Sequence, residues 1–163
     1  MLCKIDHYLK ILYRLSGYIA AIFLILVAIF ILTGIASRIF GFYIRGLAEY
    51  SGYCMAASSF LALAYTFGEK GHIRITLFLE RAKKEVRRFL ELWCLLIATF
   101  FSGFLSYYFI KMLIISIKFG ERSEGADEIY IWIPQVAVAL GSTIFFVCVL
   151  HNFILLILKR NGN

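Results

Sequence analysis

The chain has 163 residues, of which 62% are hydrophobic and only 17% are charged. A water-soluble domain of this size cannot bury that much apolar surface, so a soluble globular protein is excluded. The net charge of +7 does not indicate a nucleic-acid partner, because the basic residues cluster in short segments between long apolar stretches, where they favour a fixed membrane topology.

Four apolar segments are each long enough to cross a bilayer as a helix, which takes about 20 residues. We expect these transmembrane helices at residues 15–36, 47–67, 89–111 and 134–158. No small-residue cleavage site follows the first segment, so we expect it to be retained as an anchor rather than removed as a secretory signal. The sequence therefore predicts an all-α integral membrane protein whose single membrane domain covers residues 1–163.

Two further segments place apolar residues on one helical face and basic residues on the other. The first is an amphipathic arm at residues 1–14, and the second is a basic segment at residues 70–88. We expect both to lie along the membrane surface as interfacial helices. A solvated charged linker is the alternative for the second segment.

The distribution of lysine and arginine predicts the orientation, because positive residues near the ends of spans resist translocation. Twelve of them fall in the N-terminal segment, the loop after the second span and the C-terminal tail, whereas five fall on the opposite side. Both termini and the middle loop are thus predicted to face the cytoplasm. The acidic loop at residues 121–128 would lie outside, as a solvated loop or as a contact for a partner protein.

Small residues dominate the second span, whereas the third span is rich in aromatic residues. Small residues allow helix backbones to approach closely within a bilayer, so we expect the second span at the centre of the bundle. The bulky third span is suited to contact with lipid or with a broad partner surface.

Ionisable residues within spans are candidates for function. Glu49 opens the second span four residues after Arg45, so an interfacial ion pair at helical spacing is the alternative to a functional role. Lys111 can reach the headgroups with its long side chain. Pro134 is expected in the first turn of the last span, where proline costs no intrahelical hydrogen bond.

The sequence offers no catalytic centre. Its four cysteines lack metal-ligand spacing, and its three histidines are predicted at different depths, which opposes a metal site or a haem. The spans also carry no carboxylate at the membrane midplane, which a self-sufficient transporter uses to bind ions. We therefore expect no cofactor, no metal and no enzymatic activity.

A motif follows the second span, with the sequence Gly71-His72-Ile73-Arg74-Ile75. It resembles the G-H-[IV]-R-[IV] signature of the small (Q-type) membrane subunit of TRAP transporters, the tripartite ATP-independent periplasmic carriers. Glu49 and Pro134 open their spans as in that family. The family often has a second proline in the last span, where this chain reads Ala139-Leu140-Gly141, so the local shape there is left open.

The resemblance implies a multi-pass protein of the bacterial inner membrane that supports a large, sodium-coupled transport subunit. A periplasmic substrate-binding protein would deliver carboxylate solutes, of the sialic acid or dicarboxylate type, and phospholipid would surround the assembly. Within the motif, Gly71, His72 and Arg74 are candidates for packing the end of the second span against the amphipathic arm or the large subunit. Alternatively, Arg74 binds a lipid phosphate.

The competing class is a stand-alone four-helix membrane carrier of the small multidrug type. Such a carrier requires a carboxylate in its first span, and the first span of this chain has none.

Overall fold

A computed structural model describes residues 2–42, 44–70, 84–125 and 127–158 of the chain. Over these residues the fold consists of long α-helices without strands, and these are α1 (Leu2–Ile39), α2 (Leu47–Lys70), α4 (Lys84–Phe119) and α5 (Trp132–Leu158). The predicted all-α class is confirmed.

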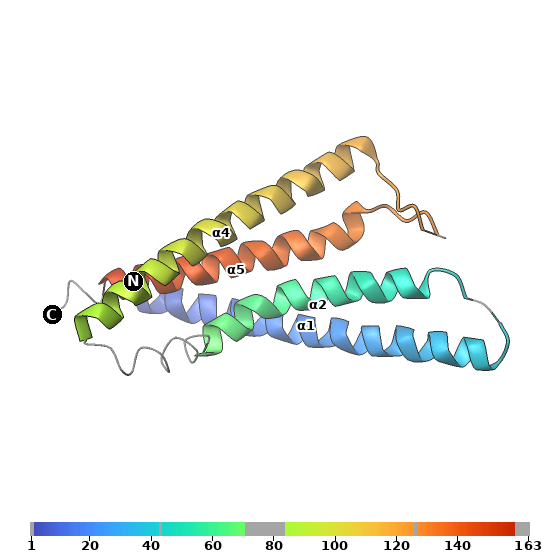
Figure 1. Cartoon of the computed structure of the whole chain (residues 1–163), viewed down its shortest axis with the longest axis horizontal. Helices are drawn as coiled ribbons and strands as arrows, with labels where there is room; N and C mark the ends of the chain where they lie inside the picture. The colour runs from blue at the N-terminus through green and yellow to red at the C-terminus, as the bar shows by residue number, and fades with distance from the viewer. Residues whose placement is uncertain (1, 43, 71–83, 126, 159–163) are drawn as a thin grey trace.

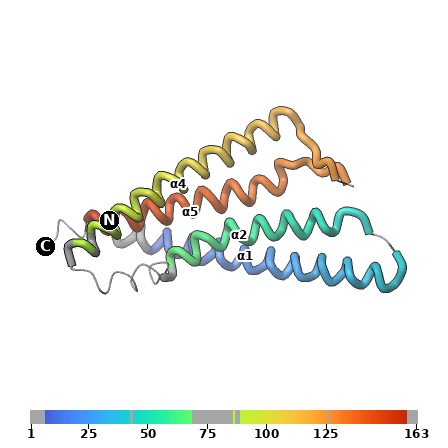
Figure 2. The backbone as a smooth tube through the Cα atoms, in the orientation of Figure 1, coloured from blue at the N-terminus to red at the C-terminus, as the bar shows by residue number. Residues whose placement is uncertain are grey.

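The helices form two hairpins, α1 with α2 and α4 with α5, as Figure 1 shows. Both hairpins turn at the same end of the molecule, which we call the hairpin end. The start of α1, the end of α2, the start of α4 and the end of α5 lie at the opposite, open end (Figure 2). The two hairpins diverge toward the hairpin end (Figure 1).

The helices pack in the order α1, α2, α5, α4, because α2 packs against both α1 and α5, and α5 packs against both α2 and α4. The Ser58 hydroxyl of α2 donates a hydrogen bond of 2.9 Å to the Ala20 carbonyl oxygen of α1. On the other side of α2, Gly141 of α5 lies so close that a Cβ atom on it would be 2.7 Å from the Phe60 carbonyl carbon. The expectation that small residues place α2 at the bundle centre is confirmed, and α5 shares that central position.

Within the described part of the chain, three helical segments are long and apolar enough to cross a membrane: His7–Ile39, Phe89–Phe119 and Trp132–Leu158. The fourth predicted span, at residues 47–67, corresponds to α2. It is long enough, but its serine, glycine and tyrosine residues lower its mean hydropathy, so a membrane crossing by α2 remains a prediction.

The first helix is continuous from Leu2 to Ile39. We expected an interfacial helix at residues 1–14 and a span from residue 15, and in the structure one helix, α1, runs through this boundary without interruption. Tyr13 and Ser16 are buried, with exposed fractions of 5% and 2%. The end of the predicted arm is thus part of the bundle, because a charge such as Arg14 marks a membrane edge without ending a helix.

Helix α4 is longer than the predicted span at residues 89–111 and continues to Phe119. Its end is set by Gly120, which has a φ of 60° and closes a pair of hydrogen bonds to the last turn, from its own N–H to the Ile117 carbonyl and from the Glu121 N–H to the Ser116 carbonyl. Lys111 therefore lies roughly 12 Å inside the end of the helix, with an exposed side chain.

Candidate functional site

Of the predicted site residues, the structure describes Glu49 and Pro134. Glu49 lies in the first turn of α2 and Pro134 in the first turn of α5, as expected, and both are at the hairpin end. Gly71, His72 and Arg74 lie outside the described residues, immediately after the last residue of α2, Lys70. The length of α2 separates Glu49 from Lys70, the last described residue before the motif, by about 32 Å.

The ion pair of Glu49 with Arg45 was expected from helical spacing, and the structure does not have that spacing. Helix α2 begins at Leu47, after a turn in which Gly46 has a φ of 74°, so Arg45 is not one helical turn before Glu49. The Glu49 carboxylate instead packs against Gly125 of the α4–α5 loop, where even a Cβ atom would overlap it. Glu49 thus sits at a junction between α2 and the other hairpin.

Two tyrosines of α2 extend this junction. The Tyr50 hydroxyl donates a hydrogen bond of 2.8 Å to Asp127 Oδ2, and the hydroxyl oxygens of Tyr53 and Ser123 are 2.9 Å apart. We call these two contacts the tyrosine clasp. The Tyr50 ring also lies 5.8 Å from the ring of Phe30 in α1, so one side chain connects α1, α2 and the α4–α5 loop.

The α4–α5 loop has its own fold, which presents Ser123 and Asp127 to the clasp. An antiparallel bridge joins Arg122 and Tyr130, and the Arg122 guanidinium lies 4.9 Å from the centre of the Tyr130 ring. The Ser123 N–H donates to the Ile129 carbonyl at 2.7 Å. The predicted acidic loop is therefore a folded element that ties the two hairpins together.

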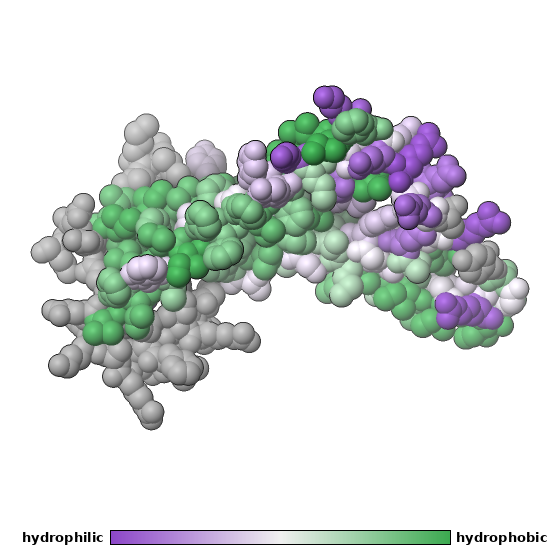
Figure 3. Space-filling view, turned by 45° about the horizontal axis from the view of Figure 1, so that its top comes forward, coloured by the Kyte–Doolittle hydropathy of each residue, from purple (hydrophilic) through white to green (hydrophobic). Residues whose placement is uncertain are grey.

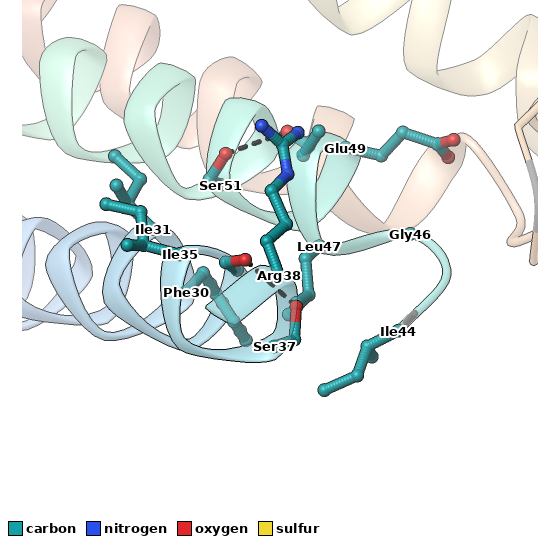
Figure 4. Close-up of a pocket in the computed structure, with 12 residues that line it drawn as sticks. Phe30, Ile31, Ile35, Ser37, Arg38, Ile44, Gly46, Leu47, Glu49 and Ser51 are labelled. Carbon is teal, nitrogen blue, oxygen red and sulfur yellow. Dashed lines mark hydrogen bonds between the residues drawn. The ribbon is translucent and has the colours of Figure 1, made fainter. Parts of the chain in front are cut away.

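A cavity of about 370 Å³ lies between the ends of α1 and α2 at the hairpin end. Its apolar wall includes Phe30, Ile31 and Ile35, and Arg38 extends across it toward Ser51 of α2 (Figure 4). Glu49 extends away from Arg38, toward the α4–α5 loop (Figure 4). The cavity thus has an apolar side and a cationic side, and the Glu49 carboxylate is not aimed into it.

The open end holds a tightly packed cluster of buried residues: Tyr13, Ala64 and Cys148, contributed by α1, α2 and α5. The Cys148 thiol donates a weak hydrogen bond to the Ala64 carbonyl at 3.5 Å. Partly buried Leu9 and Phe67 pack against the cluster. Contacts at this end are close and mainly apolar, in contrast to the polar contacts of the clasp.

On the face that Figure 3 shows, most side chains in the middle of the molecule are apolar, and the strongly polar side chains gather toward the hairpin end. Helices α1 and α4, the outer members of the row, carry the most exposed large residues, such as Leu32 at 65% and Phe100 at 68%. Over the described residues, no three His, Cys, Asp or Glu side chains are grouped to hold a metal ion.

Sequence reasoning identified Glu49 and Pro134 but missed the tyrosine clasp and the cation at Arg38. The i, i+3 spacing of Tyr50 and Tyr53 on one face of α2 was a usable signal, because both rings then point to the same side of the helix. Their partners, more than 70 residues away in the sequence, were not indicated by any local pattern.

A known protein family matches most of the chain. The model described as "Tripartite ATP-independent periplasmic transporters, DctQ component" matches residues 26–159, a range that includes α2, α4 and α5 and residues 26–39 of α1. No curated protein and no solved structure matches the chain.

Proposed function

The chain belongs to the DctQ component family of tripartite ATP-independent periplasmic (TRAP) transporters, and we propose that it is the accessory subunit that supports the large transport subunit in the membrane. In this proposal the large subunit carries the sodium and substrate sites. The substrate is a carboxylate, of the sialic acid or dicarboxylate type, delivered by a periplasmic binding protein.

The position of the polar side chains is the observation that supports an accessory role. The tyrosine clasp and the Arg38 cavity lie at one end of the bundle, whereas the interior between α2 and α5 is closed by contacts such as Gly141 against Phe60. Buried hydroxyls, for example those of Ser16 and Ser142, donate to carbonyls of their own helix. A charged solute needs charged or strongly polar groups along its path, whereas the polar side chains buried among the described residues are serines and none is charged.

We further propose that α2 is a fourth span. It runs beside α1 and α5, which are both apolar enough to cross, and its length of about 36 Å exceeds the roughly 30 Å of a hydrocarbon core. The hairpin end then faces the periplasm, and the basic segments and both termini face the cytoplasm of a bacterium, as the lysine and arginine distribution predicts.

The partners in this proposal are the large transmembrane subunit, the periplasmic binding protein and the surrounding phospholipid. The exposed apolar faces of α1 and α4 are available for the first and the last of these. The folded α4–α5 loop, with Glu124 and Glu128 exposed, is the candidate contact for the binding protein.

The first test is purification of the chain from its native membrane in mild detergent, with mass spectrometry of the proteins that accompany it. A stoichiometric large membrane protein would support the proposal, and carboxylate uptake by that partner should fall when the chain is removed. A clean homo-oligomer, or unchanged uptake by the large subunit alone, would contradict it in favour of a stand-alone carrier.

The motif is tested in the same uptake assay. His72→Ala should abolish uptake at normal expression if His72 packs the end of α2 against a neighbouring element. Unchanged uptake in both His72→Ala and Arg74→Ala would remove the motif from the proposed mechanism.

A further inference from the structure

A second cavity, of about 170 Å³, opens between α1 and α2 at the open end of the bundle. It is lined by Lys10, Tyr13 and Arg14 from α1 and by Tyr65 and Gly68 from α2. Two of these five side chains are cationic and two are aromatic. We call this cavity the Lys10–Arg14 pocket.

Close packing of the two helices shapes the pocket. Gly17 of α1 lies against the Tyr65 ring of α2, where a Cβ atom would be 2.7 Å from the Tyr65 Cγ atom. Gly68 leaves room for the buried Tyr13 ring, whose Cδ2 atom would be 3.4 Å from a Cβ at Gly68. The floor of the pocket is therefore fixed, because Tyr13 is held in the cluster with Ala64 and Cys148.

The two cations are arranged to act together. Lys10 and Arg14 are four residues apart on a continuous helix, so their side chains project from the same face of α1 at neighbouring levels. Both are exposed and line the same opening. A compact dianion or monoanion with several oxygens, such as a phosphate group, matches two adjacent cations.

Exposed apolar side chains beside the pocket favour the phosphate of a lipid over a free phosphate. Toward the hairpin end, the same face of α1 continues with Tyr18 and Ile22, which are 64% and 58% exposed. A phosphate held at Lys10 and Arg14 would thus stand directly above an apolar stripe that suits an acyl chain. Basic pockets between spanning helices on the cytoplasmic side are typical sites for anionic lipid headgroups.

We propose that the Lys10–Arg14 pocket binds the headgroup of an anionic phospholipid. The leaflet, which would be the cytoplasmic one, rests on the orientation given under the proposed function. Binding itself does not depend on orientation or on a partner subunit, so it can be tested on the purified chain.

The test is native mass spectrometry of the detergent-purified chain after addition of phosphatidylglycerol or phosphatidylcholine with identical acyl chains. The wild type should retain phosphatidylglycerol in preference, and the double variant Lys10→Gln/Arg14→Gln should lose about tenfold in phosphatidylglycerol affinity, as expected when charged hydrogen-bond partners are removed. The matched control is Arg45→Gln/Lys118→Gln, which removes the same charge from exposed positions that line neither cavity.

Equal retention of the two lipids, an unchanged double variant, or the same loss in the control would overturn the proposal. Inorganic phosphate separates the two sources of the anion: if it displaces the lipid at an affinity equal to that of phosphatidylglycerol, the ligand is a free phosphate and the lipid assignment is wrong. If the double variant does not fold, a salt titration of the wild type tests the proposal in its place. Raised salt should reduce retention of phosphatidylglycerol but not of phosphatidylcholine.

Discussion

Helices α2 and α4 pack in opposite ways. Helix α2 is rich in alanine, serine and glycine and packs between α1 and α5. Helix α4 carries a nearly continuous series of exposed aromatic residues, among them Phe100, Phe104 and Tyr107, and packs mainly on α5. The helix with the lower hydropathy is the one at the centre, and the bulky helix is at the edge.

The difference follows from the absence of a hydrophobic driving force between helices inside a membrane. Lipid tails are as apolar as leucine, so a large apolar side chain gains little by facing another helix, whereas small residues gain close backbone contact. In this bundle the position of a helix therefore follows the size of its side chains rather than their hydropathy, and four substitutions test that conclusion.

The largest effect is expected for Gly141→Leu, at the contact of α5 with α2. A Cβ atom at this position would be 2.7 Å from the Phe60 carbonyl carbon and 2.8 Å from the Leu61 nitrogen, and backbone atoms cannot move aside as a side chain can. We expect a loss of at least ~1–3 kcal/mol of stability, measured by thermal unfolding in detergent. The control is Gly52→Leu, because a Cβ at Gly52 meets nothing within 4 Å; an equal loss in both variants would contradict close packing of α2 on α5.

The second test concerns the tyrosine clasp. Tyr50→Phe removes the hydroxyl that donates to Asp127, so the α4–α5 loop should be released more often and trypsin should cleave after Arg122 several times faster. Tyr107→Phe on α4 is the matched control, since that ring is 62% exposed. If both variants are cleaved at the wild-type rate, the clasp does not hold the loop.

A smaller effect is expected for Ser58→Ala, which removes the hydrogen bond from α2 to the Ala20 carbonyl of α1. Hydrogen bonds between helices in membranes contribute about 0.6 kcal/mol on average, so the melting temperature should fall slightly. Ser59→Ala serves for comparison, because the exposed Ser59 hydroxyl donates only within its own helix, to Met55. A larger fall in melting temperature for Ser59→Ala than for Ser58→Ala would contradict the contact of Ser58 with α1.

The smallest effect is expected for Phe101→Ala on the edge helix. Its side chain is 63% exposed, so in a micelle the substitution removes contact with detergent rather than contact with another helix. The free energy of unfolding of the isolated chain, measured in detergent, should therefore change by no more than about 0.5 kcal/mol. A destabilisation comparable to that of Gly141→Leu would show that α4 is packed by bulky residues after all.

Local patterns in the sequence predicted the parts of the fold that depend on local physics. Apolar length located the helices, the first-turn position of Pro134 was predicted correctly, and the small residues of α2 predicted its central place. The late end of α4 was also visible in principle, because Gly120 is the kind of residue that closes a helix in the left-handed conformation.

Other features depend on packing between distant segments and could not be predicted in this way. Charges near Arg14 mark a membrane edge, but they do not show that α1 continues and that Tyr13 reaches the bundle core. The contacts of Tyr50 and Tyr53 join residues that become neighbours only after the two hairpins dock. The Glu49 carboxylate lies at Gly125 for the same reason.

The central place of α2 has a consequence for biosynthesis. As the chain emerges from the ribosome, α1 is available to cover one side of α2 at once, whereas α5, which covers Phe60, Leu61 and Ala64, is made last. We expect α2 to enter the bilayer efficiently only as the second half of its hairpin with α1. The surface of α2 that packs against α5 would then stay uncovered until α5 is inserted. In an insertion assay, α2 alone should be translocated or rejected far more often than α2 preceded by α1.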